Sequence, residues 1–236
     1  MLVPHKESIL IVDDIKVVVP ASNALLTPFV LKEQRDWFED EIRFIRRLVK
    51  PGMIIVDIGA NYGLYALTSA KNSVTGKVWA FEPTGSVAEC LQESITANAL
   101  SNVQLIQVGL SNRDGKATLR LNDNPELNAI DEAPSEDGHY ETIVLKKLDS
   151  CADEFNWESL DFIKLDAEGE ELKILEGGQS TLARLSPVIM YELKHGENVN
   201  FSLIEKFQSY GYESYYLLPG PMVLVPFRSD MDVDPF

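Results

Sequence analysis

The stretch MIIVDIGANYGLYAL, residues 53–67, decides the fold. Its first four residues form a continuous apolar run, which is typical of a strand buried on both faces of a sheet, and Asp57 ends the strand with a charge. Gly59 and Gly63 then bracket a short turn in which the backbone can fold tightly and approach a ligand, before apolar residues begin a helix. The sequence therefore predicts a strand, a glycine turn and a helix amino terminus.

Length and composition narrow the class of protein around this stretch. The chain has 236 residues, of which 45% are hydrophobic, so it can bury a sizeable core and is expected to form one enlarged domain. Its net charge of -16 would repel phosphate backbones and anionic lipids, so we expect neither nucleic acid nor a membrane as partner, and a small molecule instead. The amino terminus lacks the features of a signal peptide, which predicts a cytoplasmic protein. Cys90 and Cys151 have no metal-binding spacing and are expected to be reduced thiols.

The first 50 residues are expected to form an appendage to the main fold. Two β-rich runs within residues 8–20 predict a small hairpin, and apolar residues at helical spacing predict a helix over residues 32–49. The helix either docks onto the sheet or acts as a lid over the substrate. Residues 51–227 are expected to form the main domain, and residues 228–236 a poorly ordered tail. The appendage could also support a homodimer.

Strands and helices alternate through the main domain, which predicts an α/β fold with a mostly parallel central sheet and helices on both faces. A long polar segment, residues 122–140, is either a cover on the substrate side or a solvated insertion. After the opening strand, the pattern predicts strands at 77–81, 103–108, 161–165, 188–191, 213–218 and 222–225, and helices at 86–98 and 202–210.

Acidic residues follow three of these strands and predict a polar crevice. Glu82 lies about 20 residues beyond the glycine turn, where a carboxylate can accept hydrogen bonds from both ribose hydroxyls of a nucleoside. Asp166 and Glu168 follow the strand at 161–165, and Glu192 follows the next strand, with His195 three residues on. Because ligands bind outside the carboxyl ends of parallel strands, we expect these groups to face one crevice.

The glycine turn does not have the GxGxxG pattern of a dinucleotide site, which weakens a nicotinamide interpretation. An acidic residue two positions before the first glycine is instead the arrangement of class I methyltransferases. The segments VDIGANYGLYAL, FEP, DFIKLDAEGEELKILEGG and VIMYELKHG resemble the FkbM family of S-adenosylmethionine-dependent methyltransferases, and the resemblance covers residues 34–216.

The resemblance implies a Rossmann-like class I methyltransferase fold over residues 51–227. It also implies transfer of a methyl group from S-adenosylmethionine to a hydroxyl oxygen of a polyketide, a glycan or another small secondary metabolite. The expected cofactor-binding residues lie in the glycine turn and at the ends of the next two strands: Asp57, Gly59, Asn61, Gly63, Glu82 and Ser111. Ser111 or backbone groups are assigned to the adenine because the third strand ends without an acid.

Four residues are candidates for the general base that would remove the hydroxyl proton: Asp166, Glu168, Glu192 and His195. Each has a plainer alternative, since an acid near a helix start often caps that helix and a histidine in a polar segment is often an exposed loop residue. Asp166, Glu168 and Glu192 together could also bind a divalent cation such as magnesium, although no metal is favoured.

Two other classes of function remain open from the sequence. An NAD(P)-linked oxidoreductase would need the GxGxxG turn that is absent here. A catalytically inactive acidic interaction domain on the same fold is compatible with the composition, but it leaves the carboxylates at the strand ends without a role.

Overall fold

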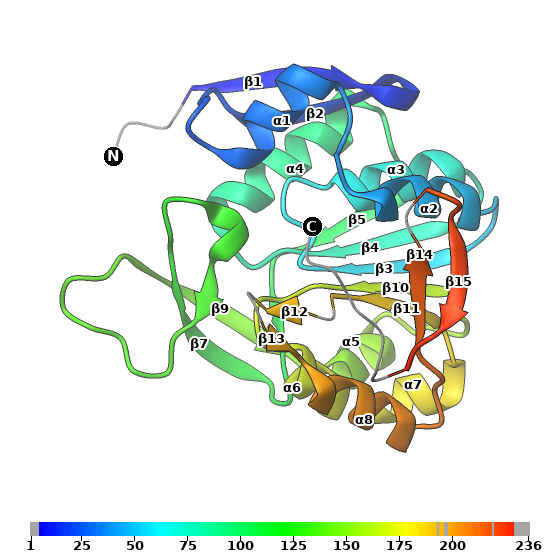
Figure 1. Ribbon diagram of the computed structural model, residues 1–236. Coiled ribbons are helices and arrows are strands. Elements are labelled where there is room, and N and C mark those ends of the chain that lie inside the picture. The colour runs from blue at the N-terminus through cyan, green and yellow to red at the C-terminus, as the bar shows by residue number, and fades with distance from the viewer. Residues whose placement is uncertain (1–4, 193, 196–197, 219, 229–236) are drawn as a thin grey trace.

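A five-stranded parallel sheet forms the centre of the protein, as seen in the computed structural model, which describes residues 5–192, 194–195, 198–218 and 220–228 (Figure 1). In spatial order the strands are β11 (Val188–Tyr191), β10 (Phe162–Leu165), β3 (Ile54–Ile58), β4 (Lys77–Phe81) and β5 (Val103–Ile106). The chain starts this sheet at β3, adds β4 and β5 on one side, and then adds β10 and β11 on the other side of β3. The strand order therefore changes direction between β3 and β10, and open α/β sheets bind ligands at such a point.

Helices cover both faces of the sheet, as predicted, and a separate hydrophobic cluster fills each side (Figure 1). Side chains alternate along β3, so Ile55 enters one cluster while Val56 and Ile58 enter the other. One face carries α3 (Leu64–Asn72) and α4 (Gly85–Ala97). The other carries α5 (Leu148–Glu154), α6 (Glu171–Gly177), α7 (Gln179–Leu185) and α8 (Phe201–Ser209).

The predicted amino-terminal hairpin is present and shares the core of the sheet. It consists of β1 (Lys6–Ile11) and β2 (Ile15–Pro20), joined by a short 3₁₀ turn, η1 (Val12–Asp14). Its β2 strand packs against α4, where the Val18 amide donates a hydrogen bond to Ser94 Oγ at 2.8 Å. The hairpin is therefore built into the helical layer on this face.

The single helix predicted over residues 32–49 is wrong, because the structure has two helices there. The first, α1 (Leu26–Gln34), ends where Arg35 adopts a left-handed conformation with φ of 57°. The second, α2 (Asp40–Leu48), packs against α3 and buries Ile42 and Ile45. The helical spacing of the apolar residues continues across this break, so periodicity alone does not reveal it.

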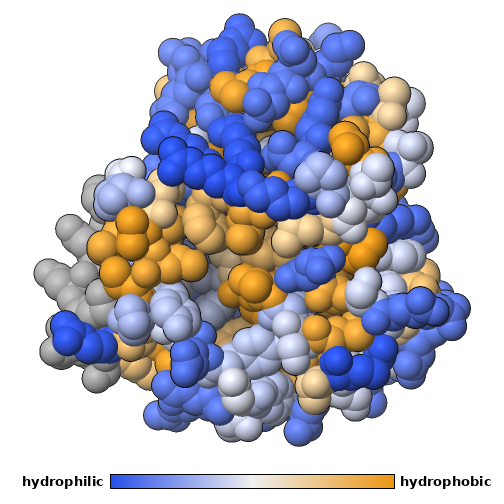
Figure 2. All heavy atoms as spheres, turned by 90° about the vertical axis from the view of Figure 1, so that its right-hand side faces the viewer, coloured by the Kyte–Doolittle hydropathy of each residue, from blue (hydrophilic) through white to orange (hydrophobic). Residues whose placement is uncertain are grey.

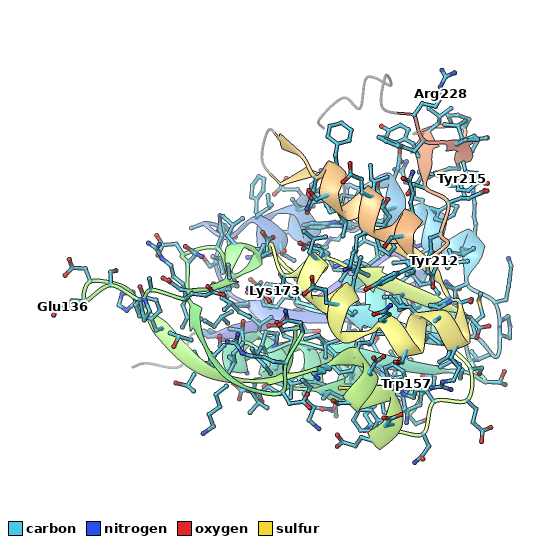
Figure 3. The ribbon with its side chains drawn as sticks, turned by 90° about the horizontal axis from the view of Figure 1, so that it is seen from below. Glu136, Trp157, Lys173, Tyr212, Tyr215 and Arg228 are labelled. Atoms are coloured by element: carbon cyan, nitrogen blue, oxygen red, sulfur yellow. The ribbon has the colours of Figure 1, made fainter. Side chains whose placement is uncertain are left out.

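A second, four-stranded sheet interrupts the α/β alternation and was not predicted as a unit. Its order is β6 (Gly109–Leu110), β9 (Tyr140–Lys146), β7 (Gly115–Arg120) and β8 (Ala129–Ile130). The segment predicted as a long loop contains η2 (Pro125–Leu127) and β8, followed by a tip that projects from the body, with Glu136 at its end (Figure 3).

Two small hairpins complete the fold: β12 (Lys194–His195) with β13 (Asn198–Val199), and β14 (Tyr215–Leu218) with β15 (Val223–Pro226). The tail predicted at residues 228–236 falls, apart from Arg228, outside the described residues. Within the described part of the chain, no helix has both the length and the apolar character needed to cross a membrane.

Candidate functional site

A cavity of about 1320 Å³ lies at the carboxyl ends of the central strands. Its lining includes the glycine turn after β3, the residues that follow β4 and β10, and parts of α1, α2, η2 and β14. Segments that are far apart in the sequence therefore meet where a parallel sheet with this strand order is expected to bind its ligand.

The glycine turn fits tightly against the end of β10. Gly59 has φ of 72°, and a Cβ atom at this position would lie 1.8 Å from the backbone oxygen of Asp166. Gly63 has φ of 90°, and a Cβ there would lie 2.2 Å from Leu91 Cδ1. The amide of Gly59 also donates to the backbone oxygen of Phe81 at 3.1 Å, which joins the turn to β4. Both glycines are thus required by backbone conformation and by space.

Glu82 connects the turns that follow β3 and β4. Its side chain is 6% exposed; Oε2 accepts from the Asn61 amide at 3.0 Å, and Oε1 accepts from the Thr84 amide at 2.8 Å. Burial raises the pKa of Glu82, and these two bonds oppose that shift. Each carboxylate oxygen can accept a further bond, so Glu82, which lines the cavity, is able to receive ligand hydroxyls as well.

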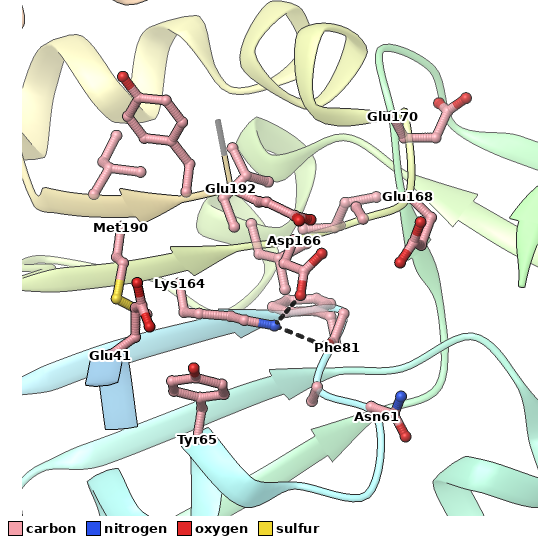
Figure 4. A pocket seen from close by; sticks show the side chains of 18 of the residues that line it. Glu41, Asn61, Tyr65, Phe81, Lys164, Asp166, Glu168, Glu170, Met190 and Glu192 are labelled. Carbon is pink, nitrogen blue, oxygen red and sulfur yellow. Dashed lines mark hydrogen bonds and ion pairs between the residues drawn. The ribbon is translucent and has the colours of Figure 1, made fainter. Parts of the chain in front are cut away.

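Asn61 shapes the turn through its own backbone. It adopts a left-handed conformation with φ of 49°, and its Oδ1 accepts from the Tyr62 amide at 2.7 Å. Asn61 lines the cavity (Figure 4). Asn61 therefore has left-handed backbone geometry and also faces the cavity.

Asp57 lies beneath the turn and is not among the residues that line the cavity. It is 1% exposed, and no group of the described residues forms a hydrogen bond with either carboxylate oxygen, although the nearby Ala66 amide lowers its pKa. Burial raises the pKa of Asp57 to about 6, against the opposing charge of Lys164. Asp57 is therefore placed to act on the site through charge, from behind the turn.

Lys164 lies beside Asp57 because the two residues are paired in the register of β10 and β3. Its Nζ donates to Asp166 Oδ2 at 2.9 Å and to the backbone oxygen of Gly59 at 3.3 Å (Figure 4). It also lies 5.1 Å from the ring centre of Tyr65. Burial opposes the charge of Lys164, but Asp166 and Asp57 outweigh burial and raise its pKa, so the ammonium stays charged.

Asp166, Glu168 and Glu192 gather at the ends of β10 and β11 (Figure 4). Asp166 is fixed by its ion pair with Lys164, whereas burial and then the charge of Asp166 raise the pKa of both Glu168 and Glu192 to about 7. Glu192 is exposed to solvent, and its carboxyl group lies beside Asp166 (Figure 4). The cluster therefore contains groups that exchange protons near neutral pH.

The loop before α6 is capped by Glu171, and not by Asp166 or Glu168 as the sequence also allowed. Glu171 Oε1 accepts from the Ala167 amide at 2.9 Å and from the Gly169 amide at 3.2 Å, which holds the loop before α6. In this way the loop amides are satisfied by Glu171, and Asp166 and Glu168 are turned toward the cavity.

Other predicted site residues are placed differently. Ser111 is 1% exposed and does not line the cavity; its hydroxyl donates to Glu170 Oε2 at 2.8 Å, so the structure does not place it at an adenine site. His195 has a described backbone in β12, but its side chain lies outside the described part of the structure. Among the side chains that are described, no group of three His, Cys, Asp or Glu residues is arranged to hold a metal ion, so the proposed cation ligands do not form such a set.

Several cavity residues were missed or given another role by the sequence interpretation. Tyr65, in the helix that follows the glycine turn, donates from its hydroxyl to Glu39 Oε2 at 2.6 Å. Glu126 comes from the polar segment 122–140, and Glu41 from the start of α2. No periodicity or motif marks these residues; the one signal for the two glutamates is that each stands where an element begins.

The linker before α2, together with β11 and the β14–β15 hairpin, lines one side of the cavity mainly with apolar side chains, and α2 adds Phe44 beside the acids Asp40 and Glu41. Apolar side chains also gather on the face that carries this hairpin (Figure 2). This part of the cavity, which we call the apolar half, includes Trp37, Phe38, Phe44, Met190, Tyr215 and Leu224. The glycine turn, Glu82 and Thr84 line the opposite end, which we call the turn half. The three acids at the ends of β10 and β11 lie between the halves.

Comparison with known proteins agrees with this geometry. The chain matches the Methyltransferase FkbM domain over residues 57–214. It is 29% identical over 153 residues to methyltransferase sdnD of Sordaria araneosa, covering 52% of this chain and 59% of that protein. It is 25% identical over 158 residues to 2-O-methyltransferase NoeI of Sinorhizobium fredii, covering 60% of this chain and 64% of that protein. The chain thus spans less than two thirds of the length of these two relatives.

Among solved structures, the chain is similar to a precorrin-6y C5,15-methyltransferase of Geobacter metallireducens, with a TM-score of 0.46 and 14% identity, over 78% of this chain and 79% of that one. The domain match covers the glycine turn, Glu82 and the Asp166 to Glu192 region, which are the parts of the sequence that build the cavity. The central sheet and its switch point are those of the class I methyltransferase fold. The chain belongs to the FkbM methyltransferase family.

Proposed function

We propose that the protein transfers a methyl group from S-adenosylmethionine to a hydroxyl oxygen of a small-molecule acceptor. The observation that carries the proposal is that one cavity holds a nucleoside-type turn half and an apolar half, with a carboxylate cluster between them. A methyl donor and an acceptor bound in the two halves would meet beside Asp166, Glu168 and Glu192. The 2-O-methyltransferase among the relatives supports oxygen as the acceptor atom.

Two features of the turn half suit S-adenosylmethionine. Gly59, where a side chain would collide with the end of β10, lets the turn lie against that strand while the turn lines the cavity. Glu82 retains acceptor capacity toward the cavity and is suited to two ribose hydroxyls. When bound, the cofactor supplies an activated methyl group on a positively charged sulfur.

The residues of the chain would contribute position and proton transfer. Holding the donor and the acceptor oxygen in line accounts for about 7 to 11 kcal/mol of barrier lowering in favourable systems. Glu192, with a pKa raised to about 7, has the basicity expected of a group that takes the hydroxyl proton at neutral pH. Asp166, oriented by Lys164, would hold the acceptor hydroxyl and favour the positive charge that develops on it.

The charge of the cavity also selects the acceptor. One described lining residue, Lys164, is basic and ten are acidic: Glu39, Asp40, Glu41, Glu82, Glu126, Asp166, Glu168, Glu170, Glu192 and Glu213. An acceptor with a carboxylate or phosphate would be repelled, whereas a neutral or cationic acceptor with an apolar body fits. We therefore propose a hydroxylated acceptor without negative charge.

Calorimetric titration of the protein with S-adenosylhomocysteine and, separately, with NADH tests the proposal. We expect micromolar binding of S-adenosylhomocysteine and none of NADH. The Asp166→Asn variant should keep this binding but lose at least about a hundredfold in turnover, measured with an acceptor found by screening hydroxylated glycans and polyketides. Absent binding of S-adenosylhomocysteine would refute the methyltransferase assignment.

A further inference from the structure

Two segments outside the central sheet meet at the turn half of the cavity. Thr27, in the first turn of α1, is 2% exposed and donates from Oγ1 to Glu126 Oε1 at 2.5 Å. Glu126 belongs to η2, and both residues line the cavity together with Tyr62 of the glycine turn. The hydrogen bond therefore fixes Glu126 above the turn.

Two polar groups at this meeting point have no hydrogen-bond partner within the part of the chain that the structure describes. The second oxygen of Glu126, Oε2, is buried without such a partner, and so is the hydroxyl of Tyr62, a residue that is 2% exposed. The two groups influence each other, since burial and next the charge of Glu126 raise the pKa of Tyr62. Buried polar groups are rarely left unpaired, so this pair in the wall of a cavity indicates a missing ligand atom.

The missing partner should carry a positive charge. A carboxylate removed from water is best compensated by a cation, and among the described lining residues Lys164 is the one cation, already bonded to Asp166 and Gly59. S-adenosylmethionine carries two cationic groups, the sulfonium and the α-ammonium of its amino acid moiety. The α-carboxylate next to that ammonium also has a suitable position, because the amino terminus of α3, which follows Tyr62 directly, favours an anion.

We propose that Glu126, oriented by Thr27, and Tyr62 form the subsite that accepts the α-ammonium group of the cofactor. The inference rests on the proposed function, because it assigns one end of the same ligand. In this arrangement Glu126 Oε2 accepts a charge-assisted hydrogen bond from the ammonium, and the Tyr62 hydroxyl offers its oxygen as a second acceptor. The segment around η2 thus becomes part of the cofactor site.

Calorimetric titration with two probes tests the subsite. S-adenosylhomocysteine has the α-ammonium but no sulfonium, whereas 5′-methylthioadenosine has neither group and keeps the adenosine. We expect Glu126→Gln to weaken binding of S-adenosylhomocysteine about tenfold or more and to leave binding of 5′-methylthioadenosine unchanged. Glutamine can still accept from Thr27, so the variant removes charge with little change of shape. Glu136→Gln, at the exposed tip of the same segment, is the matched control and should change neither affinity (Figure 3).

Two further variants separate orientation from charge. Thr27→Val keeps the shape of residue 27 and frees Glu126, so it should weaken S-adenosylhomocysteine by less than Glu126→Gln does. Tyr62→Phe should also weaken this ligand alone. Unchanged affinity of folded Glu126→Gln for S-adenosylhomocysteine would overturn the inference, and so would an equal loss for both probes, which would place Glu126 against the adenosine. If the wild-type protein binds neither probe, the proposed function fails instead.

Discussion

Lys164 is the residue on which the charges of the site converge. Its ammonium lies between the buried Asp57 and the cavity-facing Asp166, and its side chain is 10% exposed. The alternation of side chains along β3 and β10 puts Asp57 and Lys164 on one face, so this pairing follows from strand register. Lys164 is therefore both a structural cation and the group that orients Asp166.

Lys164→Met should destabilise the protein strongly, because it leaves two carboxylates without their buried counter-charge. Removing one partner of a buried ion pair costs about 3–5 kcal/mol, so we expect a loss of that size in the free energy of unfolding, measured by urea titration. Lys173→Met is the control, since Lys173 pairs with Glu132 and Glu170 near the surface and should cost less than about 1 kcal/mol. Equal losses in the two variants would contradict a buried role for Lys164.

The pH dependence of turnover tests the role of Glu192. If Glu192 takes the hydroxyl proton, turnover should rise with pH and level off above an apparent pKa of about 7, which is the value expected for its carboxyl group. Burial is the larger cause of this raised pKa, and the charges of Asp166 and Glu168 add to it. Glu168→Gln should therefore move the rising limb to lower pH, and Glu192→Gln should abolish it. A limb that stays in place in Glu192→Gln would assign the proton to another group.

At the residue scale, the sequence predicts groups whose roles depend on local chain geometry. Gly59 and Gly63 are recognisable because a turn between strand and helix needs them, and Glu82 because it ends the next parallel strand. Thr27 and Glu126 are not, because their contact joins positions 99 residues apart in the sequence. Glu171 is a second case in which the sequence does not identify the partner. Its contacts with the loop amides could equally have been made by one of the three acids that precede α6, which are Asp166, Glu168 and Glu170.

The linker between α1 and α2 positions the wall of the cavity that α2 provides. Arg46 of α2 donates to both oxygens of Asp36 in this linker, at 2.9 and 2.6 Å. It also forms an ion pair with Asp13 of η1 at 2.9 Å. One guanidinium therefore ties the hairpin, the linker and the helix together.

Arg46→Met should loosen α2 and lower the stability of the protein by about 2 kcal/mol, the scale of hydrogen bonds to charged groups. The methionine keeps most of the aliphatic packing, so the loss reports the guanidinium bonds. Arg43→Met is the matched control on the same helix, because Arg43 is 60% exposed and its ion pair within the described residues is with Asp40, three residues before it. Chemical denaturation measures both variants, and a loss in Arg46→Met no greater than that in Arg43→Met would contradict the role given to Arg46.

At the element scale, strands of the parallel sheet are predictable and irregular additions are not. The apolar run from Val78 to Phe81 lies between Lys77 and Glu82, and β4 spans Lys77–Phe81 as predicted. The break at Arg35 needs only one residue in a left-handed conformation, which leaves the apolar spacing intact. In the same way, β9 exists because it pairs with β6 and β7, and its own sequence was insufficient to identify it.

At the scale of the whole molecule, acidic side chains are concentrated around the cavity. The chain has a net charge of -16, and Asp57, Glu168 and Glu192 are held in surroundings that disfavour their ionised forms. Each pKa is raised in the folded state, first by burial in all three cases. The site is therefore built at the expense of stability, as is usual for groups that exchange protons near neutral pH.

The stability of the protein should consequently fall as the pH rises from about 5 to 8. Between the ordinary pKa of a carboxyl group and its raised value of about 6 or 7, the folded state retains a proton that the unfolded chain has lost. Because the folded state then binds more protons, raising the pH through this window favours unfolding. Thermal unfolding at several pH values should show the Tm decreasing over this range. The double variant Glu168→Gln, Glu192→Gln should show a flatter curve and a higher Tm at pH 8, whereas a wild-type Tm that rises over the window would show that these carboxyl groups are not held protonated in the folded protein.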